Sequence, residues 1–194
     1  WNNQKLLNKA EVKSYQNIKR QIIEDKTELT QVKGFNNYFK KSSELANKII
    51  EAQDYNKADS LALMAMGLSL YTDFHSSGHI YETLVNSGDI KLLKNSEIPS
   101  KLQKLEMTYI NVNNLEDIHW EIIINELSPL LRGVINYNTK KPVQPKKLYD
   151  VEMQNYFIES IYLTIRKDSV YTKALREIDT IITMIDNELN LNSE

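Results

Sequence analysis

The stretch Tyr171–Leu189, YTKALREIDTIITMIDNEL, decides the fold. Its apolar residues recur at alternating spacings of four and three, which places them on one face of an α-helix. We expect this helix to run from about Val151 to Asn190, roughly 60 Å at 1.5 Å per residue. A helix of this length needs a partner of similar length. The residues of its apolar face are Tyr171, Leu175, Ile178, Ile182, Ile185 and Leu189.

The partner is predicted to be the first helix, from Trp1 to Val32. Its second half carries an apolar stripe that Asp25 interrupts, and Gly34 is the expected helix stop. Its first half is mostly polar, so residues 1–14 are expected to project from the body as a stalk. The stripe consists of Tyr15, Ile18, Ile22, Leu29 and Val32.

Further helices are predicted between these two. One runs from about Phe35 to Ala52, and one from Lys57 to Asp73 that is apolar on nearly every side and therefore central. A short helix from His79 ends at Ser87-Gly88, where glycine suits a left-handed cap. The residues expected to be buried in the first of these are Phe39, Leu45, Ile49 and Ile50.

A longer helix is expected to begin near Glu97 and to continue toward Leu127. Its apolar face shifts along the helix, and Ser128-Pro129 is expected to kink or restart it. Residues 137–147, with two prolines and paired lysines, form the best loop candidate. The apolar face consists first of Leu102, Leu105, Tyr109 and Val112, and then of Leu115, Ile118 and Ile122.

The composition agrees with this helical pattern. The chain has 194 residues but only five Gly and four Pro, so few breaks are available. We find no strand alternation and no fixed-period repeat. The sequence therefore predicts an all-α fold: a single domain over residues 1–194, built as an antiparallel helical bundle with long first and last helices.

Charge and cysteine content exclude several functions. The net charge is −2 and the basic residues are scattered, which argues against a nucleic-acid-binding role. The absence of Cys removes disulfides, thiolate metal sites and Cys nucleophiles. No Gly-x-Ser-x-Gly elbow and no glycine-rich phosphate loop occur. No catalytic residue and no cofactor is predicted.

The histidines supply the candidates for a metal site. Asp73, His75, His79 and Glu82 lie close in sequence, and the last two share a helical face. The alternative is a polar turn with capping side chains. Glu116 and His119 form one Glu-x-x-His unit, but a di-iron bundle needs two, so we interpret His119 as a helix-surface or boundary residue beside Trp120.

Tyrosines offer a different kind of site. They are expected either to line a small-molecule cleft between helices or to fill the edges of the core. Those on or near predicted helix faces are Tyr71, Tyr81, Tyr109, Tyr156, Tyr162 and Tyr171.

Two sequence boxes are distinctive. One is the opening Trp1-Asn2-Asn3, and the other is Tyr81-x-x-Leu84-x-x-Ser87-Gly88-x-Ile90-x-Leu92-Leu93-x-Asn95. Together with the long first and last helices, these boxes resemble a family of bacterial proteins with one N-terminal membrane helix, the domain of unknown function numbered six thousand and ninety. In that family an Asn-x-Trp-Asn box follows the membrane helix. The resemblance implies an extracytoplasmic, periplasmic domain on a membrane tether that precedes Trp1. It implies no activity and no catalytic residues.

Three functions follow from these observations. The preferred hypothesis is a non-enzymatic interaction or sensory bundle, anchored in the inner membrane by a preceding helix and able to bind a protein partner or to form homo-oligomers. The second is a metal- or small-molecule-binding bundle, which could also be an enzyme, that uses the Asp73–Glu82 cluster. The third is a cytoplasmic scaffold that dimerises through Tyr171–Leu189.

Overall fold

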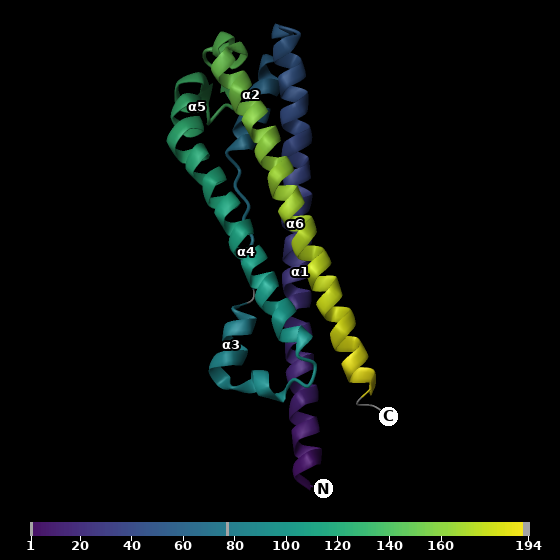
Figure 1. The fold of residues 1–194 in the computed structure, drawn as a ribbon. Helices are drawn as coiled ribbons and strands as arrows, with labels where there is room; N and C mark the ends of the chain where they lie inside the picture. Colours follow the sequence, from purple (N-terminus) through teal and green to yellow (C-terminus); the bar gives the residue numbers. More distant parts are fainter. Residues whose placement is uncertain (1, 77, 192–194) are drawn as a thin grey trace. The chain divides into compact units, whose positions relative to one another are not determined.

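The computed structural model describes residues 2–76 and 78–191. Trp1, on which the tether prediction rests in part, lies outside the described residues. The chain is all-α, as predicted (Figure 1). Its helices are α1 (Asn2–Glu51), α2 (Ala58–Leu68), α3 (Ile80–Ser87), α4 (Glu97–Ile122), a π-helical segment η3 (Ile123–Leu127), α5 (Ser128–Val134) and α6 (Val151–Leu191). Short 3-10 turns lie at Tyr55–Lys57, Asp89–Leu92 and Pro145–Tyr149.

The chain forms two compact units, and α1, α4 and α6 each contribute a segment to both. Unit 1 contains the residues up to 31, residues 74–112 and the residues from 170 onward. Unit 2 contains residues 32–73 and 113–169. That the chain is one domain over 1–194 stays a prediction.

Helix α1 is continuous through Gly34, so the predicted stop at this glycine is wrong. Buried positions recur at spacings of four and three along the helix, and this line of buried positions, the seam, continues past Gly34. Packing along the seam outweighs the cost of about 1 kcal/mol for a helical glycine. The seam residues are Glu11, Tyr15, Ile18, Ile22, Asp25, Leu29, Val32, Asn36, Phe39, Ser43 and Ala46.

The seam of α1 begins at Glu11, which is buried, whereas Leu6 and Leu7 before it are 65% and 53% exposed. The seam also excludes Leu45, which is 48% exposed although the sequence predicted its burial. Ser43 takes the neighbouring seam position in its place. The spacing, rather than the hydrophobicity of single residues, decides which side chains are buried.

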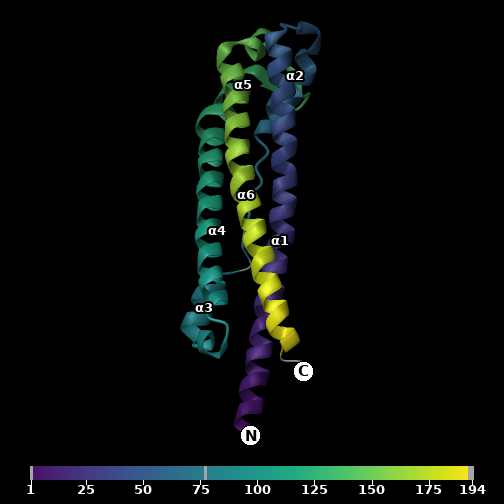
Figure 2. The ribbon, with the colours of Figure 1, turned by 45° about the vertical axis from the view of Figure 1, so that its right-hand side comes forward.

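Helices α1 and α6 run antiparallel within each unit (Figures 1 and 2). In unit 1, Lys19 pairs with Asp186 and Lys26 with Asp179, so seven residues forward on α1 match seven residues back on α6. In unit 2, Asn36 Nδ2 donates to the backbone carbonyl of Thr164 at 2.8 Å, and Ser43 Oγ to Ser160 Oγ at 3.2 Å.

The seam of α6 keeps the predicted spacing with a small change of residues. Tyr171, Ile178 and Ile185 are fully buried, as predicted. Ala174 and Ile181 are the other seam residues, while the predicted Leu175, Ile182 and Leu189 are only half-buried beside it.

Helix α4 begins at Glu97, as predicted, and buries Leu102, Leu105, Tyr109 and Val112. Its seam then continues through Glu116 and His119, and Ile118 is 43% exposed. Leu115 is buried, as predicted, but the predicted switch of the seam to Ile118 is wrong. Before Ser128-Pro129 the helix widens into a π-helical segment, which confirms the predicted interruption.

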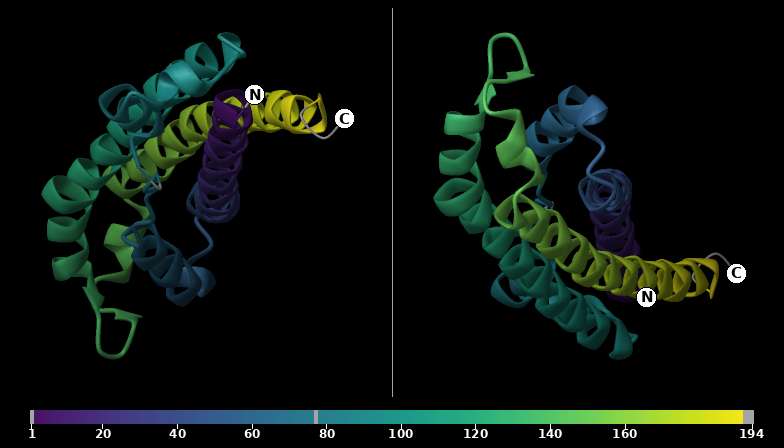
Figure 3. Two further views of the ribbon diagram at one scale, coloured as in Figure 1. Left: turned by 90° about the horizontal axis from the view of Figure 1, so that it is seen from below. Right: turned by 90° about the horizontal axis from the view of Figure 1, so that it is seen from above.

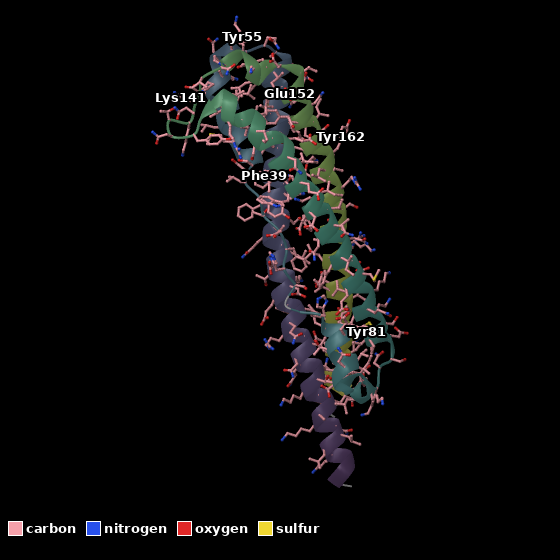
Figure 4. All side chains as sticks on the ribbon, turned by 90° about the vertical axis from the view of Figure 1, so that its left-hand side faces the viewer. Phe39, Tyr55, Tyr81, Lys141, Glu152 and Tyr162 are labelled. Atoms are coloured by element: carbon pink, nitrogen blue, oxygen red, sulfur yellow. The ribbon has the colours of Figure 1, made fainter. Side chains whose placement is uncertain are left out.

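Unit 2 is completed by α2, α5 and a hairpin. Helix α2 ends at Leu68 rather than at Asp73, and its Leu63 is 52% exposed, so α2 is not buried on all sides. The loop predicted at 137–147 contains strand β2 (Lys141–Pro142), paired antiparallel with β1 (Ile135–Asn136). Figure 3 shows this hairpin at the end of α5, and Lys141, labelled in Figure 4, forms an ion pair with Asp59 of α2.

Unit 1 is completed by α3, which ends at Gly88. This glycine has φ +79° and caps the helix, as the sequence predicted. Among the described residues, no helix is both long enough and apolar enough to span a membrane.

Candidate functional site

The candidate site in unit 2 is a group of ionisable side chains on the buried seams of α4 and α6. Glu116 and His119 of α4 are 1% and 7% exposed, and Lys167 of α6 is 3% exposed. We call Glu116, His119 and Lys167 the polar layer. Burial of a charge is costly unless the charge is paired, so these residues have to be explained by their contacts.

The contacts of the polar layer centre on Lys167. Its Nζ lies 3.1 Å from His119 Nδ1, so the ammonium donates to a neutral imidazole nitrogen. Tyr71, from the segment after α2, packs its ring against the rings of His119 and Trp120, with centroids 6.0 Å and 5.1 Å away. The site is therefore assembled from three parts of unit 2.

Burial lowers the pKa of both bases of the polar layer. Burial and then the charge of Lys167 lower the pKa of His119 to about 3. Burial lowers the pKa of Lys167 to about 8, although the carboxylates of Glu116 and Asp73 act to raise it. At neutral pH His119 is therefore uncharged, and Lys167 is mostly protonated and balanced by Glu116 and Asp73.

The cavity beside His119 is small. The cavity next to His119 has a volume of about 20 Å³, and its lining includes Tyr156, Glu159 and Ser160. Small-molecule sites usually need about 300 Å³ or more. A lysine of lowered pKa beside a histidine would suit nucleophilic chemistry in an open cleft, but this closed arrangement favours a polar layer inside a bundle.

The four residues predicted as metal candidates have different surroundings. His75 is exposed in unit 1, where its backbone N donates to Glu28 Oε1 at 2.9 Å. His79 precedes the first turn of α3 and Glu82 lies within it, both exposed. Asp73 lies in unit 2, where its charge raises the pKa of Lys167 and the pKa of Tyr71. Across the described residues, no group of three or more His, Cys, Asp or Glu is arranged to hold a metal ion.

His119 corrects another interpretation made from the sequence. It is buried on the seam, not at the helix surface, and Glu116 one turn earlier is buried with it. Lys167 was not predicted at all. The signal was present, because Lys167 precedes Tyr171 by four residues, and extending the α6 spacing backward reaches it. A search for apolar residues alone passes over these positions.

Unit 1 contains a second candidate, a cleft of about 350 Å³ between α1 and α3. This polar cleft is large enough for a small ligand, and most of the side chains that α1 contributes are polar. None of the six tyrosines considered for a ligand cleft is among its lining residues. These are Ala10, Lys13, Ser14, Asn17, Ile18, Gln21, Ile80, Thr83, Leu84, Asp89 and Leu92.

Two of the predicted tyrosines, Tyr109 and Tyr156, donate hydrogen bonds from buried positions. In unit 1, Tyr109 Oη donates to Asp25 Oδ2 at 2.9 Å, and burial with that carboxylate raises the pKa of Tyr109 far above its usual value. In unit 2, Tyr156 Oη donates to Glu126 at 3.3 Å. Tyr162 is 65% exposed and lies on an outer face of α6 (Figure 4).

No protein family, curated protein or solved structure matches the chain. The resemblance to the membrane-anchored family stays a prediction.

Proposed function

We propose that this chain is a non-enzymatic interaction or sensory bundle, held outside the cytoplasm on a membrane tether that precedes α1. The polar layer of unit 2 carries the sensory part of this proposal. A bundle that served only as a rigid spacer would be at least as stable with apolar residues at Glu116, His119 and Lys167. A buried charged layer is the kind of element whose packing can be shifted by a partner or ligand.

The first turns of α1 support the tether. Leu6 and Leu7 are exposed on a regular helix before the first seam residue, Glu11. An exposed helical turn with two leucines suits a stalk that continues from a membrane helix. The similarity of Trp1-Asn2-Asn3 to the box of the anchored family supports the same arrangement.

The location is tested by fusing the full-length reading frame at its C-terminus to alkaline phosphatase and, separately, to green fluorescent protein. We expect the phosphatase fusion to be active and the fluorescent fusion to be dark, because both reporters would lie outside the cytoplasm. The opposite pair of results would contradict the tether and favour the cytoplasmic scaffold that dimerises through Tyr171–Leu189.

The sensory part is tested by hydrogen exchange of backbone amides. We expect the helical turns around His119 and Lys167 to exchange faster than the apolar turns of α6 around Tyr171 and Ile178. The triple variant Glu116→Leu/His119→Leu/Lys167→Met makes the polar layer apolar and should slow these turns to the rate of the apolar ones. Equal exchange in the unmodified protein would contradict an adjustable layer.

A second candidate function, small-molecule binding, is favoured by the polar cleft of unit 1. Ser14, Asn17 and Thr83 offer hydroxyl and amide groups suited to a polar, uncharged ligand such as a sugar. Thermal-shift screening with sugars tests it, and an Asn17→Leu variant should abolish any shift. A shift that persists in this variant would place the ligand elsewhere.

A further inference from the structure

A groove of about 270 Å³ lies between the α4 and α6 segments of unit 1. We call it the basic groove. Lys101 and Lys104 are three residues apart on α4, and Lys173 and Arg176 are three residues apart on α6, so each helix presents two cations on one face. The complete lining is Lys101, Lys104, Lys173, Arg176, Glu177 and Thr180.

The positive charge of the basic groove is local. The lining carries four basic side chains and one acidic one, whereas the whole chain has a net charge of −2. Like charges on facing helices repel each other, and this repulsion is relieved when an anion binds between them. The groove therefore has the electrostatic character of an anion site.

The protein itself supplies little counter-charge to these cations. Glu177 Oε1 lies 3.8 Å from Lys104 Nζ, which is too long for a hydrogen bond. Lys101, Lys173 and Arg176 form no ion pair with any described residue. On α1, by contrast, Lys19 and Lys26 each pair with an aspartate of α6.

The two buried acids on the α1 seam of unit 1 do not require these cations. Asp25, at 0% exposure, accepts a hydrogen bond from Tyr109, and Glu11 pairs with Lys94 at 2.8 Å. In the groove itself, Glu177 has one buried oxygen without a hydrogen-bond partner. A single cation would balance this carboxylate, so the convergence of four basic side chains on one groove needs another explanation.

We propose that the basic groove binds a small di- or oligophosphate anion. Two cation pairs on facing helices match two linked phosphate groups, one for each pair. The planar guanidinium of Arg176 is suited to bidentate contact with phosphate oxygens. The groove volume lies just below the usual range of drug-sized pockets, which suits a compact anion.

The position of the groove favours a free anion over a lipid headgroup. The Lys26–Asp179 pair places the groove residues of α6 at the level of residue 26 of α1. Roughly 30 Å of helix, at 1.5 Å per residue, separates this level from Lys5. A membrane at the N-terminal end of α1, which is part of the proposed function, would lie beyond reach of the groove.

The test is calorimetric titration of the whole chain with inorganic pyrophosphate at low salt, because exposed charges are screened at higher salt. We expect saturable binding, with inorganic phosphate bound more weakly. The double variant Lys101→Gln/Lys173→Gln should lose affinity by about tenfold or more. The matched control Lys41→Gln/Lys48→Gln makes the same change of charge at exposed positions of unit 2 and should bind as the unmodified protein does.

Two outcomes would overturn the proposal. Equal weakening in both double variants would mean general attraction to a positive surface. Absence of binding to pyrophosphate, together with groove-dependent binding to vesicles of phosphatidylglycerol in phosphatidylcholine, would assign the groove to lipid. Neither result affects the reporter fusions, so failure of this proposal is distinguishable from failure of the proposed function.

Discussion

The two units bury their charged groups in opposite ways. In unit 1 the buried groups Asp25 and Glu11 are carboxylates, and each has a donor: Tyr109 for Asp25 and the backbone N of Lys94 for Glu11, which also forms an ion pair with Lys94 Nζ. In unit 2 the centre is a cation, Lys167, whose nearest partner is a histidine.

This difference predicts which unit has a stability that depends on protonation. A carboxylate is satisfied by neutral donors such as a hydroxyl or a backbone N–H, whose state does not change near neutral pH. A buried ammonium needs an acceptor, and His119 serves only while its imidazole is neutral. We therefore expect the stability of unit 2, more than that of unit 1, to follow pH near and below neutrality.

Removing the anion from the polar layer should have the largest effect. Glu116→Leu leaves Lys167 buried without this counter-charge, and we expect a loss of about 3–5 kcal/mol in the free energy of unfolding. Urea unfolding at pH 7, followed by circular dichroism, measures it. The control Glu121→Leu, at an exposed position of α4, should change stability by about 0.5 kcal/mol or less.

The same experiment has an internal check on the cause. The triple variant Glu116→Leu/His119→Leu/Lys167→Met removes every charge of the layer and should be at least as stable as the unmodified protein. A triple variant as unstable as Glu116→Leu would mean that packing, and not charge, explains the loss.

Acidification should expose the dependence on His119. Its folded pKa of about 3 lies below the unfolded value of 6.5, so between these values the unfolded chain binds more protons and stability falls as pH falls. We expect a contribution of roughly 2–3 kcal/mol to be lost by pH 4.5. Urea midpoints measured from pH 7 to 4.5 test this. His119→Leu should flatten the dependence, and His75→Gln, at an exposed position, should not.

At alkaline pH, the titration of Lys167 should make the protein more stable as pH rises. Its pKa of about 8 lies below the ordinary value of 10.5, so its contribution to stability rises as pH rises between these values. Tyr15 of unit 1 acts the other way above pH 10, because burial raises its pKa to about 12 and the unfolded tyrosine ionises first. The rise in stability between pH 8 and 10 should therefore be absent in Lys167→Met, whereas the fall above pH 10 should remain.

In unit 1 the matching change is Tyr109→Phe, which deletes one donor to Asp25. We expect a loss of about 1–3 kcal/mol, smaller than that of Glu116→Leu because a neutral partner is lost. Tyr162→Phe is the control, since its exposed hydroxyl makes no hydrogen bond with a described residue, and it should leave the urea midpoint unchanged. Equal losses in the two variants would contradict the role assigned to Tyr109.

The helical architecture could be predicted from the sequence because it depends on spacing. The three-four pattern of Tyr171, Ile178 and Ile185 identified α6, and Glu97 and Gly88 marked helix ends by local capping chemistry. These signals lie within a few residues of each other. They need no knowledge of the partner helices.

The candidate site could not be predicted in the same way. Glu116, His119 and Lys167 occupy seam positions but are polar, so a search for apolar stripes moved the seam to Ile118, which is exposed. Lys167 and His119 are separated by 48 residues and meet only through packing. The stop predicted at Gly34 failed for a related reason, because the propensity of one residue was judged without the seam on both sides.

That failure gives the smallest and most local prediction, a comparison of one glycine from each unit. Gly34 lies inside α1 with helical φ, and a Cβ there meets no atom within 4 Å. Gly34→Ala should therefore stabilise the protein by about 0.5–1 kcal/mol. Gly88, at φ +79°, also has free space, but Gly88→Ala should destabilise by about 1 kcal/mol because a side chain is strained in this conformation. Thermal unfolding of both variants measures the contrast.

Two results would contradict these expectations. If both variants were more stable, the cap of α3 would tolerate a different backbone conformation at residue 88. If Gly34→Ala were less stable, α1 would bend at residue 34.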